Sequence, residues 1–266
     1  MRPLYPLFDE YRKEFTIIGF DIETTTRKNN FYQGGLLTKD CFHYFYDKGE
    51  MIRHLLTTRL YQGPEVYIAA TNLEFDFNAL FMDTVYWTSA KRIMSGGRWI
   101  SVIIETDRGS IRFIDTASYL PASVEQLGRI LGIPKHDRPA CLGRRPRNGI
   151  ERAELLKYNH RDCEISRRFI MLIQDVVYGL GGTLKLTAAS CAMEIYRRKY
   201  HRFILRHEQE ILKEDDKLYD FIFEAYYGGR TEVFSRGRHD NVRLYDINSL
   251  YPTVMQYEYP HPHTVR

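Results

Sequence analysis

FTIIGFDIETTT, residues 15–26, decides the fold, because it has the pattern of a buried β-strand and yet carries two acids. Side chains alternate between the two faces of a strand, so Asp21 and Glu23 share one face while Phe20 and Ile22 share the other. Buried carboxylates need a cation or hydrogen-bond donors, and a divalent metal would meet that need. An equally acceptable interpretation ends the strand at Phe20 and leaves both acids in a solvated loop.

The composition indicates a globular chain. With 266 residues, 44% of them hydrophobic, the chain is long enough for one large domain or two modest ones. The net charge of +4 permits a polyanionic partner without requiring one. Because the sequence has no signal core and no apolar stretch of membrane-spanning length, we expect a soluble, intracellular protein that makes no membrane contact. Scattered cysteines without a CxxC pair argue against a zinc site and suit reduced thiols: Cys41, Cys141, Cys163 and Cys191.

The rest of the chain alternates between strand and helix patterns. Alternating or β-branched runs predict strands over residues 41–47, 65–70, 99–106 and 110–116, the last two forming a hairpin. Helical spacing predicts helices over residues 50–60, 123–131 and 151–177 and from residue 73, after the capping pair Thr71-Asn72. A glycine-rich break at 179–182 suggests a domain boundary between residues 1–182 and 183–266. This order predicts an α/β fold whose mixed sheet is flanked by helices.

Two of the predicted helices carry further acids. Asp76 follows Asn72 by four residues, and Asp162 follows Tyr158 by the same spacing, so each pair lies on one face of its helix. Apolar neighbours indicate that both helices pack against the sheet. If the two acids converge with those of the first strand, the fold gathers four carboxylates.

The three motifs, in this order, resemble those of the 3′-5′ exonucleases of family B DNA polymerases. DIE (residues 21–23) is similar to the first exonuclease motif, NLEFD (residues 72–76) to the second and YNHRD (residues 158–162) to the third. The resemblance implies a ribonuclease H-like exonuclease domain that removes 3′-terminal nucleotides from single-stranded DNA in proofreading.

The resemblance also implies a site for two divalent metal ions. Mg²⁺ or Mn²⁺ suits a site built from oxygen ligands. By resemblance, Asp21, Glu23 and Asp162 would hold the metal that activates water. Asp21 would be shared with a second metal, on which Asp76 acts partly through water. Tyr158 would orient the water, and since a phenol has an ordinary pKa of about 10, the metal has to supply the acidity.

Further residues are similar to the DNA contacts of the family. Asn72 and Phe75 would contact the 3′ end of single-stranded DNA. Ser123 begins SVEQL, which resembles the family's ligand-binding motif, and is also suited to cap a helix. Lys135 in GIPKHDR is the candidate contact to the scissile phosphate, although Arg138 stands where the family motif prefers an apolar residue.

The segment after residue 182 resembles the start of a polymerase palm in the protein-primed branch of the family. YYGGR (residues 226–230) is similar to the element that contacts template DNA, which implicates Tyr226, Gly228 and Gly229. DINSLYP (residues 246–252) is similar to the first palm motif. The palm resemblance implies metal binding by Asp246 and nucleotide binding by four residues: Asp246, Ser249, Leu250 and Tyr251.

The chain ends at Arg266 with nothing that resembles the fingers motif or the second palm acid, so we expect no polymerisation by this chain alone. Expected partners are single-stranded and primer-template DNA, together with a terminal protein primer or a separate polymerase fragment.

Two other functions compete with the exonuclease interpretation. The chain would be a non-catalytic DNA-binding or docking fragment of a split polymerase, or a free-standing exonuclease that degrades RNA. The RNA function leaves YYGGR and DINSLYP unexplained. Basic stretches at residues 143–149 and 196–203 fit either DNA contact or a solvated surface.

Overall fold

The computed structural model describes residues 5–8, 12–27, 30–201, 217, 220, 221, 224 and 232–258. The chain divides into two units, one of Pro6–Phe203 and one of Met1–Tyr5 with Ile204–Arg266. Among the described residues, no helix has the length and apolar character needed to cross a membrane.

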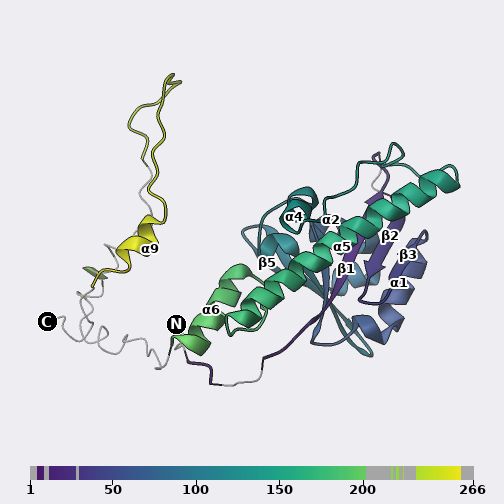
Figure 1. Ribbon diagram of the computed structural model, residues 1–266, viewed down its shortest axis with the longest axis horizontal. Coiled ribbons are helices and arrows are strands. Elements are labelled where there is room, and N and C mark those ends of the chain that lie inside the picture. Colours follow the sequence, from purple (N-terminus) through teal and green to yellow (C-terminus); the bar gives the residue numbers. More distant parts are fainter. Residues whose placement is uncertain are drawn as a thin grey trace. The chain divides into compact units, whose positions relative to one another are not determined.

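A mixed sheet forms the centre of the unit Pro6–Phe203 (Figure 1). Its strands, in chain order, are β1 (Thr16–Thr24), β2 (Phe31–Leu37), β3 (Phe42–Phe45), β4 (Val66–Ala70), β5 (Lys91–Ser95), β6 (Arg98–Thr106) and β7 (Gly109–Asp115). They lie in the order β3-β2-β1-β4-β7-β6-β5. The neighbours β1, β4 and β7 run parallel, and the other pairs are antiparallel. The predicted hairpin is confirmed by the pairing of Thr106 with Gly109.

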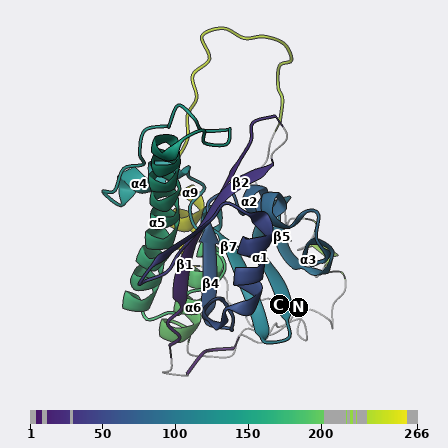
Figure 2. The same cartoon turned by 90° about the vertical axis from the view of Figure 1, so that its right-hand side faces the viewer.

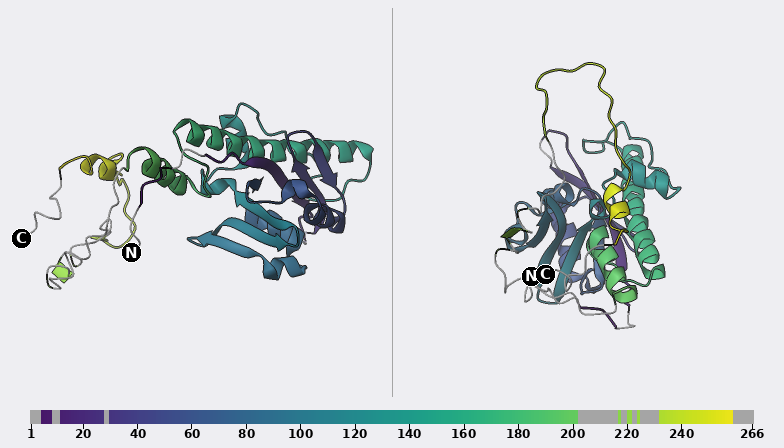
Figure 3. Two further views of the ribbon diagram at one scale, coloured as in Figure 1. Left: turned by 90° about the horizontal axis from the view of Figure 1, so that it is seen from below. Right: turned by 90° about the vertical axis from the view of Figure 1, so that its left-hand side faces the viewer.

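Helices cover both faces of this sheet. They are α1 (Lys48–Thr57), α2 (Leu73–Phe81), α3 (Val85–Ser89), α4 (Val124–Ile130), α5 (Gly149–Gly179) and α6 (Ala188–Lys199), with short 3₁₀ turns η1 (Arg59–Tyr61) and η2 (Thr116–Ser118). Figure 2 shows α1 and α5 on opposite sides of β1 and β4. The long helix α5 lies along the sheet in Figures 1 and 3 and contacts β1, β2 and β4. The predicted α/β class with a mixed, helix-flanked sheet is confirmed.

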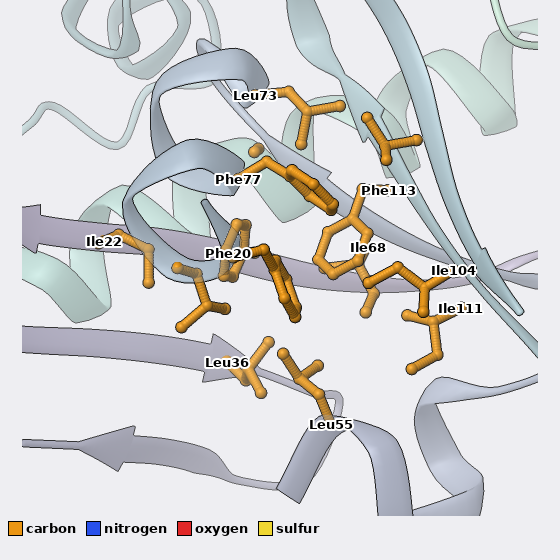
Figure 4. Close-up of a cluster of buried hydrophobic side chains, with 14 of the residues drawn as sticks. Phe20, Ile22, Leu36, Leu55, Ile68, Leu73, Phe77, Ile104, Ile111 and Phe113 are labelled. Atoms are coloured by element: carbon orange, nitrogen blue, oxygen red, sulfur yellow. The ribbon is translucent and has the colours of Figure 1, made fainter. Parts of the chain in front are cut away.

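The alternation of β1 places its residues in two separate cores. Phe20 and Ile22 pack with Phe77 of α2 in one core, which Figure 4 shows in close-up. Ile17 packs with Ile165 of α5 in the other. The two faces of β1 are therefore those that its sequence pattern predicts, and the face carrying Asp21 and Glu23 is the α5 face.

The extent of β1 decides between the two interpretations of its acids. The strand continues to Thr24, and β2 pairs Gly35 with Asp21 and Gln33 with Glu23. Both acids thus stand on the sheet, and the alternative in which the strand ends at Phe20 is wrong.

Four local features differ from the sequence pattern. Strand β2 was not expected, because Gly34 and Gly35 interrupt its apolar run, and β5 is a short, exposed edge strand. The expected second strand, residues 41–47, is the third and shorter one, β3. Asn72 takes the cap position of α2 but has a left-handed backbone, φ 69°, and makes no side-chain cap bond. Instead, Asp115 of β7 accepts the Leu73 amide at 2.9 Å.

The second unit contains the helix α9 (Leu250–Val254). Asp246 and Ser249 precede it, and Tyr251 within it is 64% exposed. Tyr226, Gly228 and Gly229 lie outside the described residues.

Candidate active site

Three carboxylates meet on the α5 face of β1. Ligand oxygens of Asp21, Glu23 and Asp162 lie within 4.8 Å of one another. Asp162, from the middle of α5, is buried, and the two acids of β1 are half-buried. Among the described residues this is the one group of three or more His, Cys, Asp or Glu side chains arranged to hold a metal.

Asp76, the fourth predicted acid, lies near this group but is not a member of it. Its side chain is 3% exposed on α2, which packs on the other face of the sheet. The charges of Glu23 and Asp162 act on Asp76, so its carboxyl stands close to theirs. The structure thus brings three of the four acids together and holds the fourth beside them.

Burial and mutual repulsion keep these acids from ionising easily. Burial and the charge of Asp162 raise the pKa of Glu23 to about 8, with Lys135 and Arg138 opposing. Burial, followed by the charge of Glu23, raises the pKa of both Asp21 and Asp76 well above the ordinary value. Like charges held in a low-dielectric site produce such shifts, and a bound cation would reverse them.

Unpaired oxygens show that the site fits a hard cation. Among the described residues, Oδ2 of Asp76 and Oδ1 of Asp162 are buried without a hydrogen-bond partner. Buried acceptors without donors are rare and costly. Because the donor set is all carboxylate, the site suits Mg²⁺ or Mn²⁺ rather than a soft metal.

Lys135 supplies the cation that lies closest to the carboxylate group. Its Nζ lies 2.6 Å from Oδ2 of Asp162 and 4.6 Å from the ring centroid of Tyr158. Burial lowers the pKa of the ammonium, but the charge of Asp162 and hydrogen bonds to Asp162 and Tyr158 outweigh it, so the pKa is raised. The lysine is therefore charged throughout the neutral range.

Tyr158 lies one helical turn before Asp162 on α5 and is buried. Burial raises the pKa of its phenol, and the hydrogen bond from Lys135 opposes the rise. Tyr158 therefore remains a neutral hydroxyl at neutral pH, able to orient a hydrogen-bonded group but not to act as a base.

A groove of about 620 Å³ adjoins the carboxylate group through Lys135, which lines the groove and pairs with Asp162. Asn72, Ser123, Lys135 and Tyr158 all line it, so four predicted site residues share one surface. Ser123 also caps α4, its Oγ accepting the Gln126 amide at 3.3 Å. Phe75, 38% exposed, lines a neighbouring groove instead.

Two further residues that support the site were not singled out from the sequence. Asp115 accepts the amides of Leu73 and Ala117, at 2.9 and 2.8 Å, and so fixes the turn that presents Asn72. Asn159 bonds the carboxylate of Asp21. Asp115 ends a strand outside the exonuclease-like motifs, so its role becomes visible only in the fold. The role of Asn159 could have been suspected from the sequence, because this residue lies inside YNHRD next to Tyr158.

The raised carboxyl pKa values predict a loss of stability as pH increases. An unfolded glutamate ionises near pH 4.5, whereas folded Glu23 keeps its proton up to about pH 8. The folded state then binds more protons, so in EDTA the free energy of unfolding should fall from pH 7 to 8, on the order of 1 kcal/mol. His54 and His136 do not contribute in this range, because their pKa values are lowered from 6.5.

Urea unfolding of the full chain at the two pH values measures this slope. Glu23→Gln should reduce it, and saturating Mg²⁺ should reverse it because metal binding favours ionised carboxylates. A flat or rising profile for the wild type in EDTA would contradict the expected electrostatics.

Comparison with known proteins shows which family the chain resembles. Residues 147–265 match the sequence profile described as DNA polymerase type B, organellar and viral. This part of the chain is similar to that family of DNA polymerases. Among curated relatives, the DNA-directed DNA polymerase of Enterobacteria phage PRD1 is 26% identical over 261 residues, 94% of this chain and 41% of the relative. A probable DNA polymerase of Podospora anserina is 34% identical over 112 residues, 41% of this chain and 9% of the relative.

The fold of the chain also matches a solved polymerase. Phi29 DNA polymerase complexed with primer-template DNA superposes with a TM-score of 0.54 and 18% sequence identity, covering 82% of this chain and 40% of the other. This match confirms the predicted α/β fold with a mixed sheet flanked by helices. The chain spans 41% of the PRD1 polymerase and smaller shares of the fungal relatives.

Proposed function

We propose that this chain carries a 3′-5′ exonuclease that removes terminal nucleotides from single-stranded DNA, the proofreading activity of a polymerase. The observation that carries the proposal is the group of three carboxylates, from β1 and α5, with oxygens within 4.8 Å of one another. The buried oxygens without partners and the raised pKa values support the same conclusion.

Asp21, Glu23, Asp162 and Asp76 would hold two Mg²⁺ or Mn²⁺ ions, which when bound supply an acidified water and a positive charge against a phosphodiester. The chain's own residues position the substrate. Asn72 and Ser123 offer polar groups along the groove for the 3′-terminal nucleotides, and Phe75 offers an aromatic face beside it.

Lys135 and Tyr158 have separate roles at the reacting phosphate. The ammonium of Lys135 stays charged next to Asp162, and the residue lines the groove, where it can bind a phosphate oxygen. The hydroxyl of Tyr158 accepts a hydrogen bond from Lys135 and orients the attacking water.

The segment after residue 182 belongs to the same proposal as part of a polymerase palm. We assign residues 1–182 to the exonuclease domain and 183–266 to a linking helix and palm segment, with nucleotide contacts at Asp246, Ser249, Leu250 and Tyr251. Asp246 would bind metal there, and the YYGGR element would contact template DNA. Single-stranded and primer-template DNA are the proposed partners, as in the solved phi29 complexes. A terminal protein primer or a separate polymerase fragment is the further proposed partner.

The test is incubation of the purified chain with 5′-labelled single-stranded DNA and Mg²⁺ or Mn²⁺. We expect a ladder that shortens from the 3′ end, absent in EDTA and in both Asp21→Ala and Asp162→Ala. Asp40→Ala is the matched control, because Asp40 is an exposed acid outside the site. The control should degrade DNA as the wild type does.

Other outcomes separate the competing functions. A folded wild type that binds the DNA without shortening it would replace the proposal with a docking or binding fragment. Faster degradation of a labelled RNA of the same sequence would replace it with a ribonuclease.

A further inference from the structure

Asn159 contacts the carboxylate at the centre of the site. Its Nδ2 donates to Oδ2 of Asp21 at 2.6 Å and approaches the Asp21 carbonyl oxygen at 3.3 Å. Asn159 is 0% exposed, lying on the face of α5 that packs against β1 and β2. One amide thus holds both the side chain and the backbone of Asp21.

Strand β2 leaves room for this amide. Gly35 pairs with Asp21, and a Cβ at Gly35 would lie 2.2 Å from Oδ1 of Asn159 and 2.6 Å from the ring of Phe42. Any larger residue at position 35 would displace Asn159. The glycine that interrupts the β2 pattern is therefore explained by the space that Asn159 needs.

The neighbouring cation does not duplicate this contact. Within the described residues, Lys135 donates to Asp162, while Asp21 lies in the same group of acids and receives its donor from Asn159. A carboxylate surrounded by like charges rotates away from them unless a donor holds it. Asn159, anchored on a rigid helix, is such a donor.

We propose that Asn159 is a positioning residue that orients the Asp21 carboxylate for a divalent cation. This inference rests on the proposed function, since it concerns the same site. The buried Oδ1 of Asn159 has no hydrogen-bond partner among the described residues. A buried amide whose oxygen has no donor costs stability. We therefore attribute the presence of Asn159 to the hydrogen bond that its amide nitrogen donates to Asp21.

The test is calorimetric titration of the full purified chain with Mn²⁺, comparing the wild type with Asn159→Leu. Leucine has a similar volume but no donor. Outer-shell partners of metal ligands typically contribute ~10–100-fold in metal affinity, so we expect Mn²⁺ to bind that much more weakly. The KM for single-stranded DNA should not change, because Asn159 is buried away from the groove, and excess Mn²⁺ should restore most of kcat.

Two glycine variants separate orientation from packing. Gly35→Ala pushes on Asn159 and should weaken Mn²⁺ binding. Gly34→Ala is the matched control: its Cβ would lie 2.5 Å from Sδ of Met51, on the opposite face, so it should lower stability but not Mn²⁺ affinity. If Asn159→Leu does not fold, the difference in Mn²⁺ affinity between Gly35→Ala and Gly34→Ala tests the role of Asn159 instead.

The outcomes are distinguishable from failure of the proposed function. A folded Asn159→Leu with wild-type Mn²⁺ affinity, or equal affinities for the two glycine variants, would overturn the role of Asn159 while the exonuclease proposal stands. A wild type that binds Mn²⁺ no better than Asp21→Ala would overturn both.

Discussion

Asp21→Asn should abolish DNA degradation and at the same time make the metal-free protein more stable. The substitution keeps the shape of the side chain, and its amide oxygen can still accept the hydrogen bond from Asn159. It removes a carboxyl group whose own pKa is raised by burial and by the charges of Glu23, Asp162 and Asp76. In EDTA at pH 8 we expect a gain on the order of 1 kcal/mol in the free energy of unfolding, since each pKa unit corresponds to about 1.4 kcal/mol.

The loss of activity should exceed the effect of any supporting residue. Outer-shell substitutions cost ~10–100-fold, so replacement of a direct ligand should cost more than about 100-fold. Urea unfolding in EDTA and a rate assay with labelled single-stranded DNA measure the two quantities on one preparation. A loss of activity together with a gain in stability is typical of substitutions in functional sites that lower the stability of the fold.

Asp40→Asn is the matched control, an exposed acid of the same charge. It should change neither stability nor rate. If Asp21→Asn retains activity, or is less stable than the wild type in EDTA at pH 8, the repulsive carboxylate group does not exist as described.

Much of this arrangement could be predicted because its signals are local. The alternation in β1 predicted which residues enter the core and that Asp21 and Glu23 face the same side, and the structure confirms both. The spacing of Tyr158 and Asp162 placed them on one helix face, which the long helix α5 confirms. Their catalytic roles stay predictions.

The parts that could not be predicted depend on contacts between distant segments. Strand β2 forms in spite of Gly34 and Gly35, since packing against α5 and α1 overrides weak strand propensity. Asp115 caps α2 across 42 residues of sequence, replacing the cap that the Asn72 side chain was expected to give. The fourth acid, Asp76, approaches from the opposite face of the sheet, and sequence spacing carries no information on that distance.

Gly19→Ala should destabilise the protein severely and disrupt the site with it. A Cβ at Gly19 would lie 2.0 Å from the carbonyl oxygen of Cys163 and 3.1 Å from Cβ of Arg167. Most of this clash is with the backbone of α5, which cannot rotate away as a side chain can. Overpacked sites cost typically 1–3 kcal/mol, and we expect a loss at or above about 3 kcal/mol in urea unfolding.

Gly149→Ala is the matched control, because a Cβ at Gly149 in the first turn of α5 meets nothing within 4 Å. It should be neutral or raise stability by about 0.4–1 kcal/mol, since alanine loses less backbone entropy in a helix. Equal stability of Gly19→Ala and the wild type would mean that β1 and α5 are not packed as closely as the structure has them.

The consequence for the site follows from where Gly19 lies. It stands two residues before Asp21 on β1, and Cys163 directly follows Asp162 on α5. A methyl group that separates strand and helix at this point separates the two elements that supply the three carboxylates. Gly19→Ala that remains folded at low temperature should therefore also bind Mn²⁺ more weakly than the wild type, whereas Gly149→Ala should bind it equally well. The close packing of β1 and α5 is thus a requirement of the metal site as well as of the fold.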